Sequence, residues 1–163
     1  MDHELATGLY TIRTIPSLQL VGRNIVEDDS FKPKGVFGQP RGVPVNDNTT
    51  FLLRHVGADS FYISCGRDHG RVVELEGKVV AALHEVELDD PFDYSVNQLW
   101  AIRPQPQHGE DVFTIESESG YWGWVMPTET PQYTPVAVRA LVSSSTMPPM
   151  YPPNELWVIE RIG

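Results

Sequence analysis

The 163-residue sequence contains one cysteine, Cys65, so no disulfide can form within the chain. A disulfide scaffold is therefore excluded. No run of roughly 18 apolar residues is present to span a bilayer, and the acidic start at residues 1–4 is not followed by the apolar stretch of a secretory signal. We expect a cytosolic protein with no membrane partner, in which Cys65 packs as a small hydrophobic side chain.

Basic residues are also scarce. The 12 Lys and Arg stand against 22 Asp and Glu, which gives a net charge of −10. Nucleic acids and anionic membranes bind clusters of Lys and Arg, and the few here are dispersed along the chain. We therefore expect no nucleic-acid partner. The excess negative charge opposes self-association, so we expect a monomer.

The patterns of common catalytic and metal sites are missing as well. There is no Gly-x-Ser-x-Gly motif and no phosphate-binding glycine loop. None of the five His pairs with Cys65 or with another His at metal-ligand spacing. We expect no catalytic residue, no metal and no cofactor, and the chain is not predicted to be an enzyme.

Turn-forming residues, in contrast, are plentiful. Gly and Pro number 13 and 14, while 40% of the residues are hydrophobic. Frequent turns in a chain with a normal apolar fraction favour an all-β fold over disorder.

Two short patterns, each with an aromatic and an aliphatic residue two positions apart, recur three times at spacings of about fifty residues. Side chains two apart lie on the same face of a strand, so each copy predicts a strand with one buried face. The first pattern occupies residues 10–13, 61–64 and 113–116, and the second occupies residues 51–54, 100–103 and 157–160.

Three such units predict a β-trefoil: a six-stranded barrel capped at one end by three hairpins, formed by a single domain over residues 1–163. The predicted second strands of the units span residues 18–24, 71–76 and 121–126. Residues 79–86 fit helical spacing and strand alternation about equally, and the repeat favours a strand. Phe51, Trp100 and Trp157 occupy equivalent positions and are expected to fill the barrel.

Three further segments have alternative interpretations. Trp122 and Trp124 share one face of a predicted strand, where they either stack on a sugar or pack in the core. The Pro-rich residues 147–153 form either a polyproline ligand or, as we favour, a rigid loop before the last strand. Residues 98–100 match the short Gln-x-Trp motif of ricin-type lectins, which supports the fold more than sugar binding.

Residues 22–34, residues 105–110 and the stretch from residue 137 to Trp157 resemble the mushroom β-trefoil serine protease inhibitors of the cospin and cnispin type. The similarity extends over nearly the whole chain and is dispersed rather than concentrated in one motif. It implies a small, acidic, cytosolic inhibitor of trypsin-like serine proteases, active in fungal defence. The implied mechanism is substrate-like: a loop held in an extended shape enters the protease cleft.

The resemblance also implies which residues bind the protease. In the cospin type the specificity residue is an Asn in the loop between the second and third strands, and Asn24 matches it. On charge alone, the Asp at the bottom of a trypsin-like pocket would prefer Arg23. We therefore take Asn24 as the first candidate, Arg23 as the second, and Lys32 or Lys34 as the third. The predicted protease-binding loop comprises Arg23, Asn24, Ile25 and Val26.

Other inhibitory modes remain open. In the cnispin type the specificity residue is a Lys late in the third unit, and the comparable residues 126–133 contain neither Lys nor Arg. Residues 67–70 are a candidate second inhibitory loop. The alternative functions are inhibition of cysteine or asparaginyl endopeptidases by the same fold, which an exposed Asn24 would also suit, and sugar binding as a β-trefoil lectin.

Overall fold

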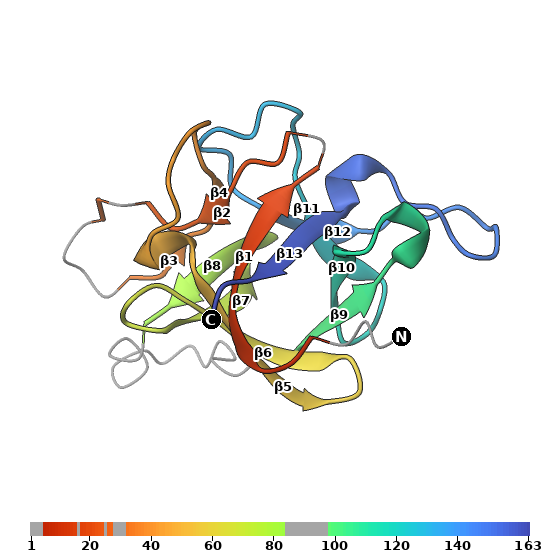
Figure 1. The fold of residues 1–163 in the computed structure, drawn as a ribbon, viewed down its shortest axis with the longest axis horizontal. Coiled ribbons are helices and arrows are strands. Elements are labelled where there is room, and N and C mark those ends of the chain that lie inside the picture. The colour runs from red at the N-terminus through yellow and green to blue at the C-terminus, as the bar shows by residue number, and fades with distance from the viewer. Residues whose placement is uncertain (1–4, 16, 25, 28–31, 84–97) are drawn as a thin grey trace.

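The computed structural model describes residues 5–15, 17–24, 26–27, 32–83 and 98–163. These residues form thirteen β-strands and three short 3₁₀ helices, and no α-helix (Figure 1). The strands are β1 (Gly8–Thr14), β2 (Val21–Gly22), β3 (Lys34–Gly35), β4 (Phe37–Gly38), β5 (Phe51–Gly57), β6 (Ser60–Cys65), β7 (Gly70–Leu75), β8 (Lys78–Ala82), β9 (Trp100–Pro104), β10 (Val112–Ser117), β11 (Trp122–Val125), β12 (Ala137–Ala140) and β13 (Trp157–Arg161). The 3₁₀ helices are η1 (Asp47–Thr49), η3 (Pro106–His108) and η4 (Pro153–Glu155).

Six of the strands close into a barrel. Antiparallel pairing runs from β1 to β5, β6, β9, β10 and β13, and β13 pairs again with β1. These are the six strands that the two repeated sequence patterns predict. Closure pairs both edges of each strand, so the barrel presents no long open edge to another chain.

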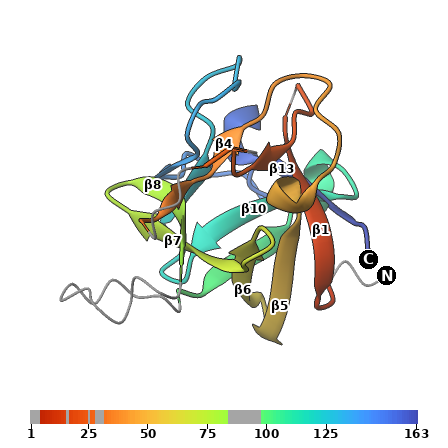
Figure 2. The same ribbon diagram turned by 90° about the vertical axis from the view of Figure 1, so that its left-hand side faces the viewer.

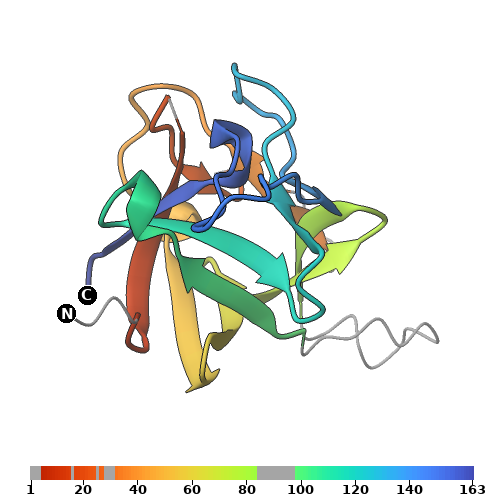
Figure 3. The ribbon, with the colours of Figure 1, turned by 90° about the vertical axis from the view of Figure 1, so that its right-hand side faces the viewer.

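Three hairpins cap the barrel, one from each unit. They pair β2 with β4, β7 with β8, and β11 with β12. The caps also bind one another, because β8 pairs with both β3 and β12. Figures 2 and 3 show the molecule from opposite sides, and Figure 2 shows β7 and β8 to one side of the barrel strands β1 and β5. The arrangement of six barrel strands and three caps is the predicted β-trefoil.

The second and third units match the predicted cap strands closely, and the first differs. Residues 71–76 and 121–126 correspond to β7 and β11, and residues 78–82 form strand β8 rather than a helix. Residues 84–86 of the ambiguous segment lie outside the described residues. In the first unit the expected strand over residues 18–24 shortens to the two residues of β2, since its partner β4 is equally short.

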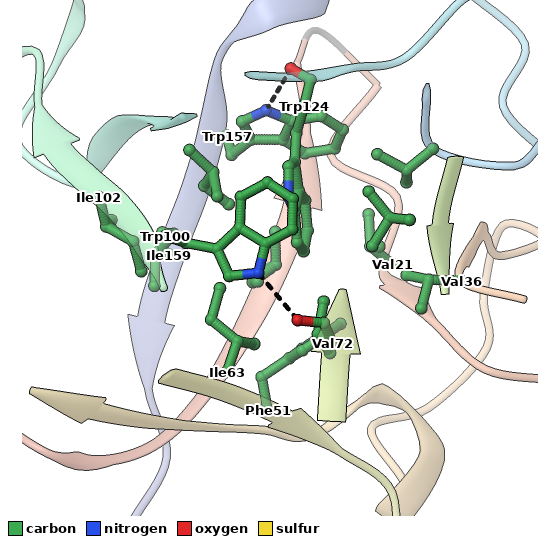
Figure 4. Packing of buried hydrophobic residues seen from close by; sticks show 14 of the residues in the cluster. Val21, Val36, Phe51, Ile63, Val72, Trp100, Ile102, Trp124, Trp157 and Ile159 are labelled. Carbon is green, nitrogen blue, oxygen red and sulfur yellow. Dashed lines mark hydrogen bonds between the residues drawn. The ribbon is translucent and has the colours of Figure 1, made fainter. Parts of the chain in front are cut away.

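The core is centred on Trp124 of β11 (Figure 4). Its indole ring contacts Trp100, Trp157 and Phe51, with ring centroids 5.8, 5.9 and 6.4 Å away, respectively. All four side chains are fully buried. The two flanking indoles donate hydrogen bonds to backbone carbonyls, Trp100 to Val72 at 2.8 Å and Trp157 to Trp124 at 3.2 Å.

Trp122 does not share the environment of Trp124, although strand alternation places both on one face. It lies at the first residue of β11, beyond the core, and its exposed fraction is 52%. The core interpretation is therefore correct for Trp124 only.

Replacing Trp124 with Ala is expected to lower the free energy of unfolding by about 3–5 kcal/mol, because the cavity would open between three aromatic side chains. The matched control Trp122→Ala should stay within about 0.5 kcal/mol of the wild type. Urea unfolding followed by circular dichroism measures both values. Equal destabilisation by the two substitutions would contradict the central position of Trp124.

Candidate protease-binding site

The predicted protease-binding loop begins where β2 ends, at Arg23. The Arg23 backbone N–H donates to the Asn48 carbonyl at 2.8 Å, which fixes the start of the loop against η1. Gly22 permits this approach, since a Cβ there would collide with the backbone of residues 48 and 49. Ile25 and residues 28–31 lie outside the described residues.

The Arg23 side chain turns inward and is buried, with an exposed fraction of 3%. Its Nε and Nη2 donate to Glu27 Oε2 and Oε1 at 3.0 and 2.6 Å. Its Nη1 and Nη2 donate to Asp68 Oδ1 and Oδ2 at 2.5 and 3.2 Å, and Nη1 also donates to the Cys65 carbonyl at 2.8 Å. The guanidinium thus holds two carboxylates in bidentate geometry, which favours Arg over Lys here. We call Arg23, Glu27 and Asp68 the Arg23 clamp.

The turn between β6 and β7 is shaped to receive this guanidinium. A Cβ on Gly66 would lie 2.5 Å from Arg23 Nη1, and a Cβ on Gly70 would lie 3.1 Å from the same atom. Gly66 also has a φ of 90°, which disfavours other residues. Residues 67–70, the candidate second inhibitory loop, therefore contribute Asp68 and Gly70 to the surroundings of the Arg23 side chain.

The contacts within the clamp favour the charged forms of Arg23 and Asp68. Burial lowers the pKa of Arg23, but the hydrogen bonds and charges of Glu27 and Asp68 outweigh burial and leave the pKa raised. The hydrogen bonds from Arg23 in turn lower the pKa of Asp68, against a smaller opposing effect of burial. Two carboxylates thus compensate one buried cation, as a buried charge requires.

Asn24 is held through its backbone. Its carbonyl accepts a hydrogen bond from Asn48 Nδ2 at 2.6 Å, and its half-buried side chain has a buried Oδ1 without a partner among the described residues. Asn48 belongs to η1, whose start is fixed by a capping box between Asn46 and Thr49. The position of Asn24 therefore depends on a side chain 24 residues further along the chain.

Asn24 and Val26 are the described residues of segment 24–26, which lies between two fixed ends and which we call the arch. Arg23 precedes the arch, Glu27 follows it, and their side chains are joined by the bidentate ion pair. Within the arch Val26 projects into solvent, with an exposed fraction of 86%. The ion pair thus joins the residues that flank this segment on either side.

The structure corrects the expectation for Arg23. As a specificity residue it would need an extended, exposed side chain, whereas it is buried and paired with Glu27 and Asp68. Of the third-ranked candidates, Lys34 is buried in β3 and Lys32 is exposed. Of the described arch residues, Val26 is exposed, and Asn24 is half-buried with its Oδ1 shielded from solvent.

The sequence alone does not indicate that Glu27, Asp68 and Asn48 hold Arg23 and Asn24 in position. Glu27 follows Arg23 by four positions, which is a local signal for an ion pair. Asp68 and Asn48 are distant in sequence, and only the trefoil brings them to the start of the loop.

The single cysteine, Cys65, is buried, as expected for a small hydrophobic side chain. Burial raises its pKa to about 12 despite the nearby Arg23 charge, so the thiol stays protonated and unreactive at neutral pH.

The Pro-rich residues 147–153 lie in the connection from β12 to β13. Gln107 Nε2 donates to the Pro149 carbonyl at 2.7 Å, and the Tyr151 N–H donates to His108 Nε2 at 3.1 Å. These contacts hold the segment against η3, as a rigid loop would be. Met147 nevertheless projects outward, with an exposed fraction of 92%.

Two features are absent from the described residues. They contain no group of three or more His, Cys, Asp or Glu side chains placed to hold a metal ion. They also contain no helix with the length and hydropathy that a membrane crossing would need.

The family model described as peptidase inhibitor I66 matches residues 3–161. The chain therefore belongs to this family of peptidase inhibitors. A proteinase inhibitor from Coprinopsis cinerea has a similar structure, with a TM-score of 0.79 and 28% sequence identity over 98% of this chain and 100% of that one. These findings confirm the resemblance to mushroom β-trefoil protease inhibitors, and they make the chain an inhibitor rather than an enzyme. No curated protein sequence matches it.

Two lectins share the fold at lower identity. A ricin B-like lectin from Macrolepiota procera, solved with lactose, is 14% identical with a TM-score of 0.65, covering 98% of this chain and 99% of that one. The Rhizoctonia solani agglutinin is 14% identical with a TM-score of 0.68, covering 99% of this chain and 100% of that one. At this identity the likeness establishes the β-trefoil fold and no shared function.

The lowered pKa of Asp68 predicts how the clamp responds to acid. A carboxylate with a depressed pKa in the folded state stabilises the protein fully above its unfolded pKa of about 4 and loses that effect as the pH falls further. The difference in unfolding free energy between the wild type and Asp68→Asn should therefore be constant from neutral pH to about pH 4 and shrink below it.

Urea unfolding at a series of pH values measures this difference. The control is Asp47→Asn, because the Asp47 carboxylate pairs with Arg67 where both side chains are largely exposed. Such exposed pairs contribute little, about 0–1 kcal/mol. A difference for Asp68→Asn no larger than that of the control at pH 7 would show that the clamp does not stabilise the fold.

Proposed function

We propose that this peptidase inhibitor acts on trypsin-like serine proteases by inserting the arch of residues 24–26 into the active-site cleft in the manner of a substrate. The observation that carries the proposal is the Arg23–Glu27 ion pair, which closes the arch across its base. A restricted loop on a closed barrel can dock with little loss of conformational freedom. Interfaces of this kind bury about 1,600 Å² in total and reach very tight affinities.

Asn24 is the specificity residue of this proposal. Its carboxamide, whose Oδ1 is buried without a partner among the described residues, would turn outward and enter the pocket as a neutral hydrogen-bonding group. It would forgo the charge-assisted bond that Arg or Lys would make with the pocket Asp. The Asn24 carbonyl would exchange its hydrogen bond from Asn48 for the N–H donors of the oxyanion hole. Because Arg23 is paired with Glu27 and Asp68, the specificity pocket of the protease would receive Asn24, the next residue, instead.

The clamp also explains how a substrate-like loop can inhibit rather than be consumed. Cleavage after Asn24 would leave Arg23 on the acyl side and Glu27 on the amine side. Their bidentate ion pair would hold the two new ends together, so the amine would stay beside the acyl carbon. Religation would then outrun release, because the reacting ends remain at high effective concentration.

Trypsin titrated with increasing amounts of the protein tests the proposal. Stoichiometric loss of activity, with a trace of chain cut after Asn24 in the mass spectrum, is the expected result. Activity unaffected at micromolar protein would exclude trypsin-like targets. A panel containing papain-type and asparaginyl endopeptidases would then identify the alternative class.

Replacing Asn24 with Ala is expected to weaken trypsin inhibition by roughly a hundredfold or more, because a central anchor of the interface is lost. The fold should persist, since the Arg23 clamp is untouched. Asn154→Ala is the control, because Asn154 is exposed on η4. Inhibition by Asn24→Ala at the wild-type level would remove Asn24 as the specificity residue.

A further inference from the structure

Trp122 is the one indole in the described residues that reaches solvent. Trp100, Trp124 and Trp157 are fully buried, whereas 52% of Trp122 is exposed. Single exposed apolar residues are common on protein surfaces, so exposure alone assigns no role. What distinguishes Trp122 is the hollow beside it.

The hollow has a volume of about 460 Å³, within the range of small-molecule sites. It lies between the turn that joins β7 to β8, the second residue before the start of β9, and the turn that follows β10. We call it the Trp122 hollow. Its lining includes Glu74, Gln98, Ser117, Ser119, Trp122 and Val138.

The polar side chains of the hollow are held in place by the protein. Gln98 Oε1 accepts from the Glu74 backbone N–H at 2.7 Å, which leaves both N–H groups of Nε2 without a partner in the described part of the chain. Glu74 Oε2 accepts from the Gly77 N–H at 2.8 Å, and its other carboxylate oxygen stays available. The hydroxyls of Ser117 and Ser119 lie 2.7 Å apart.

These groups together offer amide donors, a carboxylate acceptor and two hydroxyls beside an indole surface. A ligand that uses all of them carries several hydroxyls and one apolar face. A pyranose sugar has this character, because its hydroxyls both donate and accept while its axial C–H groups form a flat apolar patch that can pack on an aromatic ring. The described lining contains Glu74 and no Lys or Arg, which opposes an anionic ligand.

We propose that the Trp122 hollow binds a pyranose saccharide, with the sugar packed on Trp122 and its hydroxyls bound by Gln98, Glu74 and the serine pair. The hollow shares no residue with the arch or the Arg23 clamp. Sugar binding is therefore a second activity, independent of protease inhibition. The chain would attach to a glycan while its arch remains available to a protease.

The test is a titration of the full chain with methyl glycosides of galactose, glucose, mannose, N-acetylglucosamine and N-acetylgalactosamine, together with a glycan array. Tryptophan fluorescence follows binding, since the solvent-exposed emission comes from Trp122. At least one glycoside should bind with a millimolar or lower dissociation constant and shift the emission to shorter wavelength. Trp122→Ala should weaken binding on the array by roughly tenfold or more.

Tyr121→Ala is the matched control, because Tyr121 is an adjacent exposed aromatic residue that does not line the hollow. It should bind the sugar like the wild type, and both variants should retain the near-ultraviolet circular dichroism of the buried tryptophans. No sugar bound by the wild type, or equal binding by Trp122→Ala, overturns the proposal. Weakened protease inhibition by Trp122→Ala without any sugar binding also overturns it and places Trp122 in the protease interface instead.

Discussion

The three units of the barrel depend on the packing around one side chain, the Trp124 indole. Trp124 comes from the third unit and contacts Phe51 from the first, Trp100 from the second and Trp157 from its own. Close packing of large aromatic rings in a closed barrel leaves little room for the strands to shift relative to one another. The loops between the strands therefore start from fixed positions, which is the property that an inhibitory loop needs.

The Arg23 clamp extends this rigidity from the barrel to the arch. Through Asp68 and the Cys65 carbonyl, Arg23 is fixed to the turn between β6 and β7 in the second unit. Through Glu27 it is fixed to the far end of the arch. A single guanidinium thus joins two units and both ends of the segment that we propose to meet the protease. Burial of this cation is tolerated because the guanidinium donates hydrogen bonds to a carboxylate on each of two edges.

The sequence predicts the barrel strands well, because each carries its own signal in the alternation of aromatic and aliphatic residues. The first cap was harder to predict, since β2 and β4 are two residues long and β3 pairs with β8 of the second unit. Trp122 and Trp124 are two residues apart on β11 and should share one face of the strand, yet Trp122 is exposed and Trp124 is buried. Strand alternation predicts which face a residue occupies, but it does not predict how deeply the residue is buried. Arg23 looked like a candidate for the protease pocket because the chemistry of Arg suits that pocket. Its burial depends on Asp68, which is 45 residues away in sequence.

On this proposal, the Arg23–Glu27 ion pair keeps a cleaved arch in place. The most direct measurement compares the wild type, Glu27→Ala and the control Glu129→Ala during prolonged incubation with trypsin, following cut chain by mass spectrometry and recovered protease activity. In the control, Glu129 is an exposed carboxylate with no ion pair within the described chain. We expect Glu27→Ala to accumulate cut chain and release active trypsin, while the other two proteins remain intact and inhibitory. Inhibition by Glu27→Ala that lasts as long as that of the wild type would contradict it.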